Sequence, residues 1–271
     1  MEIVGRGFIA RNLQSIAHRH PDVVAFAAGV PNSTVKDDDE FGREAALLYE
    51  VVRRCLRQGR RLVFFSTASV AMYGGEGSAG TEDGPIFPGG AYGRHNLALE
   101  TALARSGVDY LVLRVSNLIG PHQRDNGLLP VLVGGIRAGT VTVYRGATRD
   151  LIDIADMTRI LDGLLDLRLS REVVNVATGH AVPVERIVAH IESRLGMVAD
   201  RRVVDGPVPH AAASVSIAKL RGLMPEVDRL GFGPRYYARV LDKYLPLYSA
   251  PLYSGPEPLQ HADHLSGHRQ A

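Results

Sequence analysis

The chain has 271 residues, of which 45% are hydrophobic and 22% charged, an ordinary composition for a globular protein that can bury a real core. Its 31 basic and 29 acidic residues leave a formal net charge of +2, which gives no electrostatic reason to bind nucleic acid or an anionic membrane surface. No apolar run approaches the ~20 residues that span a bilayer. The single cysteine, Cys55, excludes an intrachain disulfide and fits a reducing compartment. We therefore expect a cytoplasmic protein without nucleic-acid or membrane partners.

In the first half, short β-branched or aromatic runs alternate with amphipathic segments. This alternation predicts right-handed βαβ units and a parallel sheet covered by helices on both faces. The acidic run at 37–40 suits the start of a helix better than a metal site, and no metal site is expected. The expected strands are 2–4, 23–26, 62–65 and 110–113, and the expected helices are 8–18, 39–57 and 92–105.

After about Gly120 the pattern loosens. Residues 126–248 are expected to complete the sheet and to form a smaller C-terminal lobe. Residues 249–271 lack periodicity and are predicted to be a disordered tail. The tail histidines at 261, 264 and 268 are assigned to it rather than to a metal site. The expected helices are 128–138, 155–166, 183–195 and 235–244, and the expected strands are 141–144 and 173–177.

A glycine turn joins the first strand to the first helix and consists of Gly5, Arg6, Gly7, Phe8 and Ile9. Glycines at the first and third of these positions let the backbone turn and approach a pyrophosphate, and the helix start offers free N–H groups to it. The turn predicts that residues 1–125 form a dinucleotide-binding core. A tight turn without a ligand is the alternative.

The acidic residue that normally follows the second strand and holds the ribose 2′-OH is missing here. Asp22 precedes its strand instead of following it. A cluster of basic side chains near the turn would attract a 2′-phosphate, so NADP(H) is favoured over NAD(H). The cluster comprises Arg6, Arg11, His18, Arg19 and His20.

Seven ordered segments resemble motifs of the extended short-chain dehydrogenases/reductases, the NAD-dependent epimerase/dehydratase family, which includes nucleotide-sugar epimerases, dehydratases and 4-ketoreductases. The resemblance covers roughly residues 1–245. It implies a Rossmann-like, doubly wound parallel sheet with a smaller C-terminal substrate lobe. The segments are 4–10, 27–29, 66–74, 92–96, 114–121, 149–156 and 174–176.

The resemblance also implies roles for individual residues. Tyr92 would exchange a proton with the reacting oxygen, and Ser69 would hydrogen-bond the same oxygen. Ser69, Asn117 and Arg149 would contact a small-molecule substrate. Besides the glycine turn, the implied cofactor-binding residues are Ala27, Ala28, Gly29, Ser66, Thr67, Tyr92 and Asn96.

Asn96 is the main departure from the family, because it occupies the place of the lysine that follows the catalytic tyrosine by one helical turn. An amide can hold a ribose hydroxyl, but it cannot stabilise a tyrosinate by charge. Three interpretations stay open. The cationic oxidised nicotinamide tunes Tyr92, the substrate supplies its own proton, or the chain binds a dinucleotide without catalysis.

Only about 15 residues separate the glycine turn from the second strand. The family normally places a further strand, helix and strand there, which needs ~40 more residues. The first strand should therefore lie at or near a sheet edge, covered by the tail or by a second subunit in a homodimer.

A cofactor held loosely at its adenosine end suits an enzyme that exchanges it at each turnover. The expected function is NAD(P)H-dependent reduction of a ketone, either an NDP-4-keto-deoxysugar or a natural-product ketone such as a polyketide intermediate of antibiotic biosynthesis. The alternatives are an NDP-sugar epimerase or dehydratase, and a non-catalytic dinucleotide-binding protein.

Overall fold

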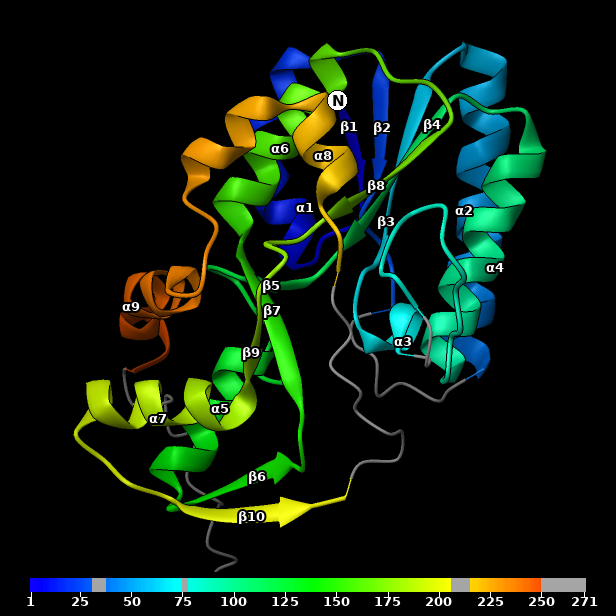
Figure 1. The fold of residues 1–271 in the computed structure, drawn as a ribbon. Helices are drawn as coiled ribbons and strands as arrows, with labels where there is room; N and C mark the ends of the chain where they lie inside the picture. The colour runs from blue at the N-terminus through cyan, green and yellow to red at the C-terminus, as the bar shows by residue number, and fades with distance from the viewer. Residues whose placement is uncertain (31–37, 75–77, 206–214, 250–271) are drawn as a thin grey trace, which may run out of the picture.

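The main sheet is parallel, has five strands and runs in the order β1-β2-β3-β4-β8. The computed structural model describes residues 1–30, 38–74, 78–205 and 215–249. Figure 1 shows the sheet between two layers of helices, with a second lobe below it. The strands are β1 Glu2–Val4, β2 Val23–Phe26, β3 Arg61–Thr67, β4 Tyr110–Val115 and β8 Glu172–Val176.

Helices cover both faces of this sheet because its strands are apolar on both sides. In β4, Leu111, Leu113 and Val115 face one layer, and Tyr110 and Val112 face the other. The first layer consists of α1 Phe8–Asn12, the 3-10 helix η1 Leu13–Arg19, α6 Ile154–Asp166 and α8 Ala218–Leu223. The second consists of α2 Asp38–Gln58 and α4 Ala91–Ser106.

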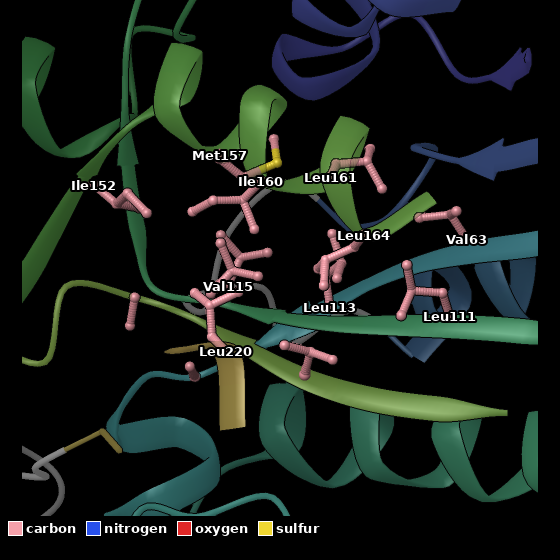
Figure 2. Close-up of a cluster of buried hydrophobic side chains, with 14 of the residues drawn as sticks. Val63, Leu111, Leu113, Val115, Ile152, Met157, Ile160, Leu161, Leu164 and Leu220 are labelled. Atoms are coloured by element: carbon pink, nitrogen blue, oxygen red, sulfur yellow. The ribbon is translucent and has the colours of Figure 1, made fainter. Parts of the chain in front are cut away.

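The apolar core on the α6 side of the sheet is the largest of the three hydrophobic clusters among the described residues. Figure 2 shows Leu113 and Val115 of β4 below Ile160 and Leu164 of α6. Leu220 of α8 packs into the same cluster. This core joins segments distant in sequence and so fixes α6, which directly follows β7, against the sheet.

The C-terminal lobe has its own core, built from short strands and three helices. Its strands form one sheet in the order β5-β7-β9 and a two-stranded parallel sheet, β10-β6. The strands are β5 Asn117–Ile119, β6 Thr140–Tyr144, β7 Thr148–Asp153, β9 Ala181–Pro183 and β10 Asp200–Val204. The helices are α5 Leu128–Arg137, α7 Val184–Leu195 and α9 Tyr236–Ser249. The remaining elements are α3 Val70–Tyr73 and the 3-10 helix η2 Pro225–Leu230.

The Rossmann-like parallel sheet and the edge position of β1 are confirmed. The expected helix 8–18 is interrupted, because its second half is the 3-10 segment η1. Strands β5, β7, β9 and β10 were not predicted. The histidines of the expected tail, and all residues after Ser249, lie outside the described residues.

Among the described residues, no helix combines the length and apolarity needed to cross a membrane. Within the same residues, no group of three or more histidine, cysteine, aspartate or glutamate side chains is placed to hold a metal ion.

The substitution Leu113→Ala tests the core shared by β4 and α6. Leu113 has no exposed surface, so its truncation should leave a cavity and lower the free energy of unfolding by roughly 2–5 kcal/mol. Urea denaturation followed by circular dichroism measures the change. Val131→Ala is the matched control, because Val131 on α5 is 52% exposed and should lose little. Equal losses in the two variants would contradict this packing.

Candidate active site

Except for Tyr92 and Asn96 on α4, the predicted cofactor residues lie at the carboxyl-terminal end of the sheet, because parallel strands have their carboxyl ends together. The glycine turn follows β1, and Ala27–Gly29 follow β2. The Ala27 amide donates a hydrogen bond to the Val4 carbonyl oxygen at 2.8 Å. The Ala68 amide, which follows β3, donates a hydrogen bond to the Val115 carbonyl oxygen at the end of β4, at 2.9 Å. The segments that follow β1, β2, β3 and β4 therefore leave the sheet at the same end.

Gly5 has a backbone that requires glycine. Its φ is +130°, and a Cβ there would collide with the carbonyl oxygen of Ala27. Gly7 precedes α1, and a Cβ on it would meet nothing within 4 Å. The turn is thus closed against β2 and open where it leads into α1, as a backbone cradle for a pyrophosphate needs to be.

The side chains of the turn divide into two groups. Arg6 is exposed, whereas Phe8 and Ile9 are half-buried and pack against the main core. The last two residues therefore have only their backbone N–H groups to offer a cofactor. These features fit a dinucleotide phosphate, and the turn remains the proposed binding segment.

Two members of the basic cluster lie at the opposite edge of the sheet. Arg19 forms ion pairs with Asp162 and Asp166 of α6, and His20 Nε2 lies 2.7 Å from Asp162 Oδ1. Both residues precede β2, so they are at the amino end of a strand whose carboxyl end faces the glycine turn. The expectation that they attract a 2′-phosphate is wrong. His18 lies in η1 beside Arg19, where the Ala17 carbonyl oxygen accepts a hydrogen bond from the N-terminal amine before β1, so only Arg6 and Arg11 of the cluster remain near the turn.

Ser69 is oriented by the turn that begins α3. Its Oγ accepts hydrogen bonds from the Ala71 amide at 3.2 Å and from Thr67 Oγ1 at 2.9 Å. Because a hydroxyl oxygen has two lone pairs, both acceptor positions are used and the Ser69 proton is left to donate. A half-buried hydroxyl with a free proton is the group needed to hold a carbonyl oxygen.

Tyr92 lies in the first turn of α4, and its surroundings keep its hydroxyl protonated. Burial raises the pKa of Tyr92 to about 12, with a further increase from the Glu44 carboxylate, while a hydrogen bond with the Asn96 side chain lowers it. The Asn96 amide is buried and also donates to the Tyr92 carbonyl oxygen at 3.0 Å. Asn96 therefore contacts Tyr92 without contributing a positive charge.

The lysines that the structure describes do not replace the missing cation. Lys219 Nζ lies 2.6 Å from Glu172 Oε2 at the start of β8, and Nζ of Lys243 in α9 lies 2.7 Å from Asp153 Oδ2 at the end of β7. Lys36 lies outside the described residues. In the described part of the chain, Tyr92 thus has no lysine beside it.

A buried ion pair holds α4 against β4. Arg114 Nη2 lies 2.7 Å from Glu100 Oε2, and both side chains are buried. Ser66 Oγ donates to Glu100 Oε1 at 2.5 Å, so the Ser66 hydroxyl points into this pair and not toward a cofactor. Only the backbone of Ser66 is left to line the sheet edge.

The same network reaches β8 and α3. Arg114 Nη1 donates to the Tyr73 hydroxyl at 2.8 Å, and that hydroxyl donates to Asn175 Oδ1 at 2.8 Å. The segments that carry Ser69 and Tyr92 are therefore tied to one set of buried polar groups. Sequence analysis missed this network, although Arg114 in an apolar strand was a signal, because a buried charge needs a partner.

In the C-terminal lobe, Asn117 begins β5 and pairs in register with Leu151 of β7, two residues after Arg149. Asn117 is half-buried and lies two residues beyond the β4 end that bonds Ala68. Asn117 therefore lies at the same end of the sheet as Ser69, which follows Ala68 directly.

Arg149 and its neighbour Asp150 have different roles. Asp150 is buried and accepts hydrogen bonds from Thr178 and Gly179, at 2.8 Å from each of Thr178 Oγ1 and the Gly179 amide, which fixes the turn after β8. Burial lowers the pKa of Arg149, and its Nη1 donates to the Thr148 carbonyl oxygen at 2.8 Å. Asp150 is structural. Arg149 is a half-buried cation, and no ion pair among the described residues joins it to a carboxylate.

Comparisons with known proteins identify the family of this chain. The model of the NAD dependent epimerase/dehydratase family matches residues 9–177. A UDP-glucose 4-epimerase of Azospirillum brasilense is 31% identical over 249 residues, covering 79% of this chain and 70% of that protein. A dTDP-6-deoxy-L-talose 4-dehydrogenase (NAD(P)(+)) of Kitasatospora kifunensis is 26% identical over 187 residues, covering 65% and 58%.

Solved structures share the fold at low sequence identity. RMD from Pseudomonas aeruginosa, complexed with NADPH, has a TM-score of 0.74 and 17% identity, covering 92% of this chain and 99% of that one. The Thermus thermophilus UDP-glucose 4-epimerase complex with NAD has a TM-score of 0.67 and 20% identity, covering 90% and 83%. The chain thus belongs to the NAD dependent epimerase/dehydratase family and is an NAD(P)-dependent enzyme of the short-chain dehydrogenase/reductase type.

Proposed function

We propose that this enzyme is an NAD(P)H-dependent ketoreductase that reduces a keto group of a small metabolite, with a nucleotide-linked 4-keto-deoxysugar as the first substrate class. The observation that carries the proposal is the state of Tyr92. Its pKa is raised to about 12 and no lysine among the described residues stands beside it. A hydroxyl that keeps its proton suits a reductase, which needs a proton donor. An epimerase needs the same tyrosine to act as base as well.

The proposed roles follow from the local geometry. When bound at this site, NAD(P)H would provide the hydride for the carbonyl carbon. Ser69, whose acceptor positions are filled, donates its proton in a hydrogen bond to the carbonyl oxygen. Tyr92 transfers its proton to that oxygen as the electrons of the C=O double bond move onto it, and the product is an alcohol. Solvent then returns a proton to Tyr92.

The nucleotide part of the substrate class rests on Arg149 and on the relatives. The relatives at 31% and 26% identity are named for UDP-linked and dTDP-linked sugars. Arg149 lies in the C-terminal lobe and is half-buried, and its hydrogen bond is to a backbone carbonyl oxygen, so its charge is free to bind an anion. A diphosphate is a ligand that such a guanidinium binds well. Asn117 would hold the sugar portion.

The shortened front half supports an exchangeable cofactor. Within the described residues, β1 pairs with β2 and with no strand on its other side. The adenosine end of a dinucleotide would therefore be weakly enclosed, which suits release after each turnover. A second subunit covering this edge, as a homodimer would provide, remains part of the proposal.

Epimerisation of a nucleotide sugar is the second candidate, and it is favoured by the relative that is 31% identical. Copurified nucleotide separates the two. An epimerase that completes an internal redox cycle should retain bound NAD after purification and interconvert UDP-glucose and UDP-galactose. We expect the protein to purify without bound dinucleotide and to leave UDP-glucose unchanged, as measured by mass spectrometry of the denatured protein and by chromatography of the sugars.

The substitution Tyr92→Phe tests the proton donor. Reduction of a dTDP-4-keto-6-deoxysugar, followed by loss of NADPH absorbance, should slow by a factor on the order of 10²–10⁴. Binding of NADPH, followed by its fluorescence, should be unchanged. Tyr49→Phe is the control, because Tyr49 is 52% exposed on α2. Undiminished reduction of this sugar by Tyr92→Phe would overturn the role of Tyr92 as proton donor.

The preference for NADP(H) is tested at Arg6. This side chain is exposed in the turn and would pair with a 2′-phosphate. Arg6→Ala should weaken NADPH binding about tenfold and leave NADH binding unchanged, since a lost charged hydrogen bond contributes about that factor. The exposed Arg53 on α2 provides the control variant, Arg53→Ala. Equal weakening of both cofactors in Arg6→Ala would refute the preference.

A further inference from the structure

A hollow in the surface lies between the end of β7, the first turns of α6, the end of η2 and α9, and has a volume of about 340 Å³. Figure 1 shows α9 on the opposite side of β5 and β7 from α3 and α4, so this hollow is separate from the proposed active site. Two carboxylates and four cations line it, namely Asp153, Asp156, Arg159, Arg229, Arg239 and Lys243.

The two carboxylates of the hollow are already neutralised by protein groups. Asp153 Oδ2 lies 2.7 Å from Lys243 Nζ, and Asp156 Oδ1 lies 3.5 Å from Arg159 Nη1. The other oxygen of each carboxylate accepts a hydrogen bond from a buried tyrosine hydroxyl of α9, at 2.7 Å for Asp153 and 2.6 Å for Asp156. These acidic side chains are therefore balanced without the remaining two arginines.

Arg229 and Arg239 are those remaining cations, and no ion pair among the described residues joins either of them to a carboxylate. Arg239 Nη2 donates a hydrogen bond to the Leu230 carbonyl oxygen at 2.5 Å, and its guanidinium carbon lies 4.9 Å from the centroid of the Tyr236 ring. Arg229 is exposed near the end of η2. Arg239 is thus oriented by uncharged groups, and the lining side chains together carry a net charge of +2.

Acidic residues close to these cations along the chain do not supply the missing negative charge. Glu226, at the start of η2, is exposed to solvent and does not line the hollow. Three others pair with basic residues outside the hollow: Asp228 with Arg221, Asp242 with Arg194, and Asp162 with Arg19. The positive charge of the hollow is therefore left for a ligand.

We propose that this hollow binds a phosphate group, either free or carried by a small metabolite. A phosphate monoester carries a charge of about −1.5 to −2 near neutral pH, which matches the two guanidinium groups without a carboxylate. Guanidinium groups also offer paired N–H donors in the geometry that phosphate oxygens accept. Leu230 and Val240 line the same hollow and provide apolar surface for an organic part of the ligand. This site does not depend on the proposed hydride transfer.

The experiment is isothermal titration calorimetry of the full chain with glucose 6-phosphate as the probe. Arg229→Ala and Arg239→Ala should each weaken binding about tenfold, because a lost charged hydrogen bond contributes about that factor. Arg186→Ala should leave binding unchanged, because Arg186 is exposed on α7 and lies outside the hollow.

Inorganic phosphate, titrated in the same way, separates the two sources of the phosphate group. Equal affinity for both probes would support a site for the free ion. Tighter binding of glucose 6-phosphate would support a site for a phosphorylated metabolite, in which the organic part contacts the hollow. In both cases the same two arginine variants should weaken binding.

Thermal unfolding gives an independent measurement. A ligand that binds only the folded state raises the Tm, but phosphate salts also stabilise folded proteins in general. The wild type and Arg186→Ala should therefore gain more Tm from sodium phosphate than from sodium chloride of equal ionic strength, and Arg229→Ala should lose part of that difference.

Unchanged phosphate binding in folded Arg229→Ala and Arg239→Ala variants would overturn the inference, because the anion would then be held elsewhere in the chain. Absence of binding by the wild type at millimolar concentrations of both probes would overturn it as well. Arg229→Ala decides the question if Arg239→Ala does not fold, since Arg229 is an exposed side chain. These titrations use neither a keto substrate nor hydride transfer, so their failure leaves the proposed function intact.

Discussion

Parallel pairing of the five main strands is the constraint on which the rest of the structure depends. It places the ends of β1, β2, β3 and β4 at one edge, where the glycine turn, Ala27–Gly29, Ser69 and Asn117 meet. The hydrogen bond from the Ala68 amide to the Val115 carbonyl oxygen holds the ends of β3 and β4 side by side. Residues more than a hundred positions apart are thereby brought to one end of the sheet, without metal ligands or disulfides in the described part of the chain.

The buried Glu100–Arg114 pair gives this edge its rigidity. Removing either partner would leave a charge without compensation in the interior, which is costly. The pair also holds Ser66 and Tyr73, so the orientation of α3 and α4 is coupled to the sheet through polar groups as well as through apolar packing. Helix α4, which carries Tyr92, is consequently held to the sheet by the Glu100–Arg114 ion pair and by apolar packing.

Two departures from the family pattern affect the two ends of the proposed cofactor site. One is Asn96 in place of the lysine near Tyr92, and the other is the short connection between β1 and β2. At the nicotinamide end, the Asn96 amide contacts Tyr92 and the Glu44 carboxylate helps to raise the Tyr92 pKa, with no lysine beside it among the described residues. At the adenosine end, β1 is the edge of the sheet. Both differences are consistent with the proposed reductase, in which Tyr92 stays protonated and the cofactor is released after each turnover.

Several features could be predicted from sequence because they depend on local chemistry. The apolar strands and amphipathic helices of the first half follow from hydrophobic period, and the edge position of β1 follows from the short connection of about 15 residues before β2. Gly5 was predictable as well, since a tight strand-to-helix turn needs a residue that adopts positive φ. The order of the motifs is what made Ser69, Tyr92 and Asn96 the predicted site residues.

Other features required the tertiary structure. The strands β5, β7, β9 and β10 are short and pair with segments distant in sequence, so local pattern does not reveal them. Arg19 and His20 are near the glycine turn along the chain, yet η1 carries them to the opposite edge, where α6 provides their carboxylate partners. Glu44 and His95 are 51 residues apart and meet only because α2 and α4 pack on the same face of the sheet. The sequence by itself thus determined the fold class and pointed to the proposed reacting groups. The charge around those groups was decided by packing, because electrostatic interaction depends on distance in space and not on separation along the chain.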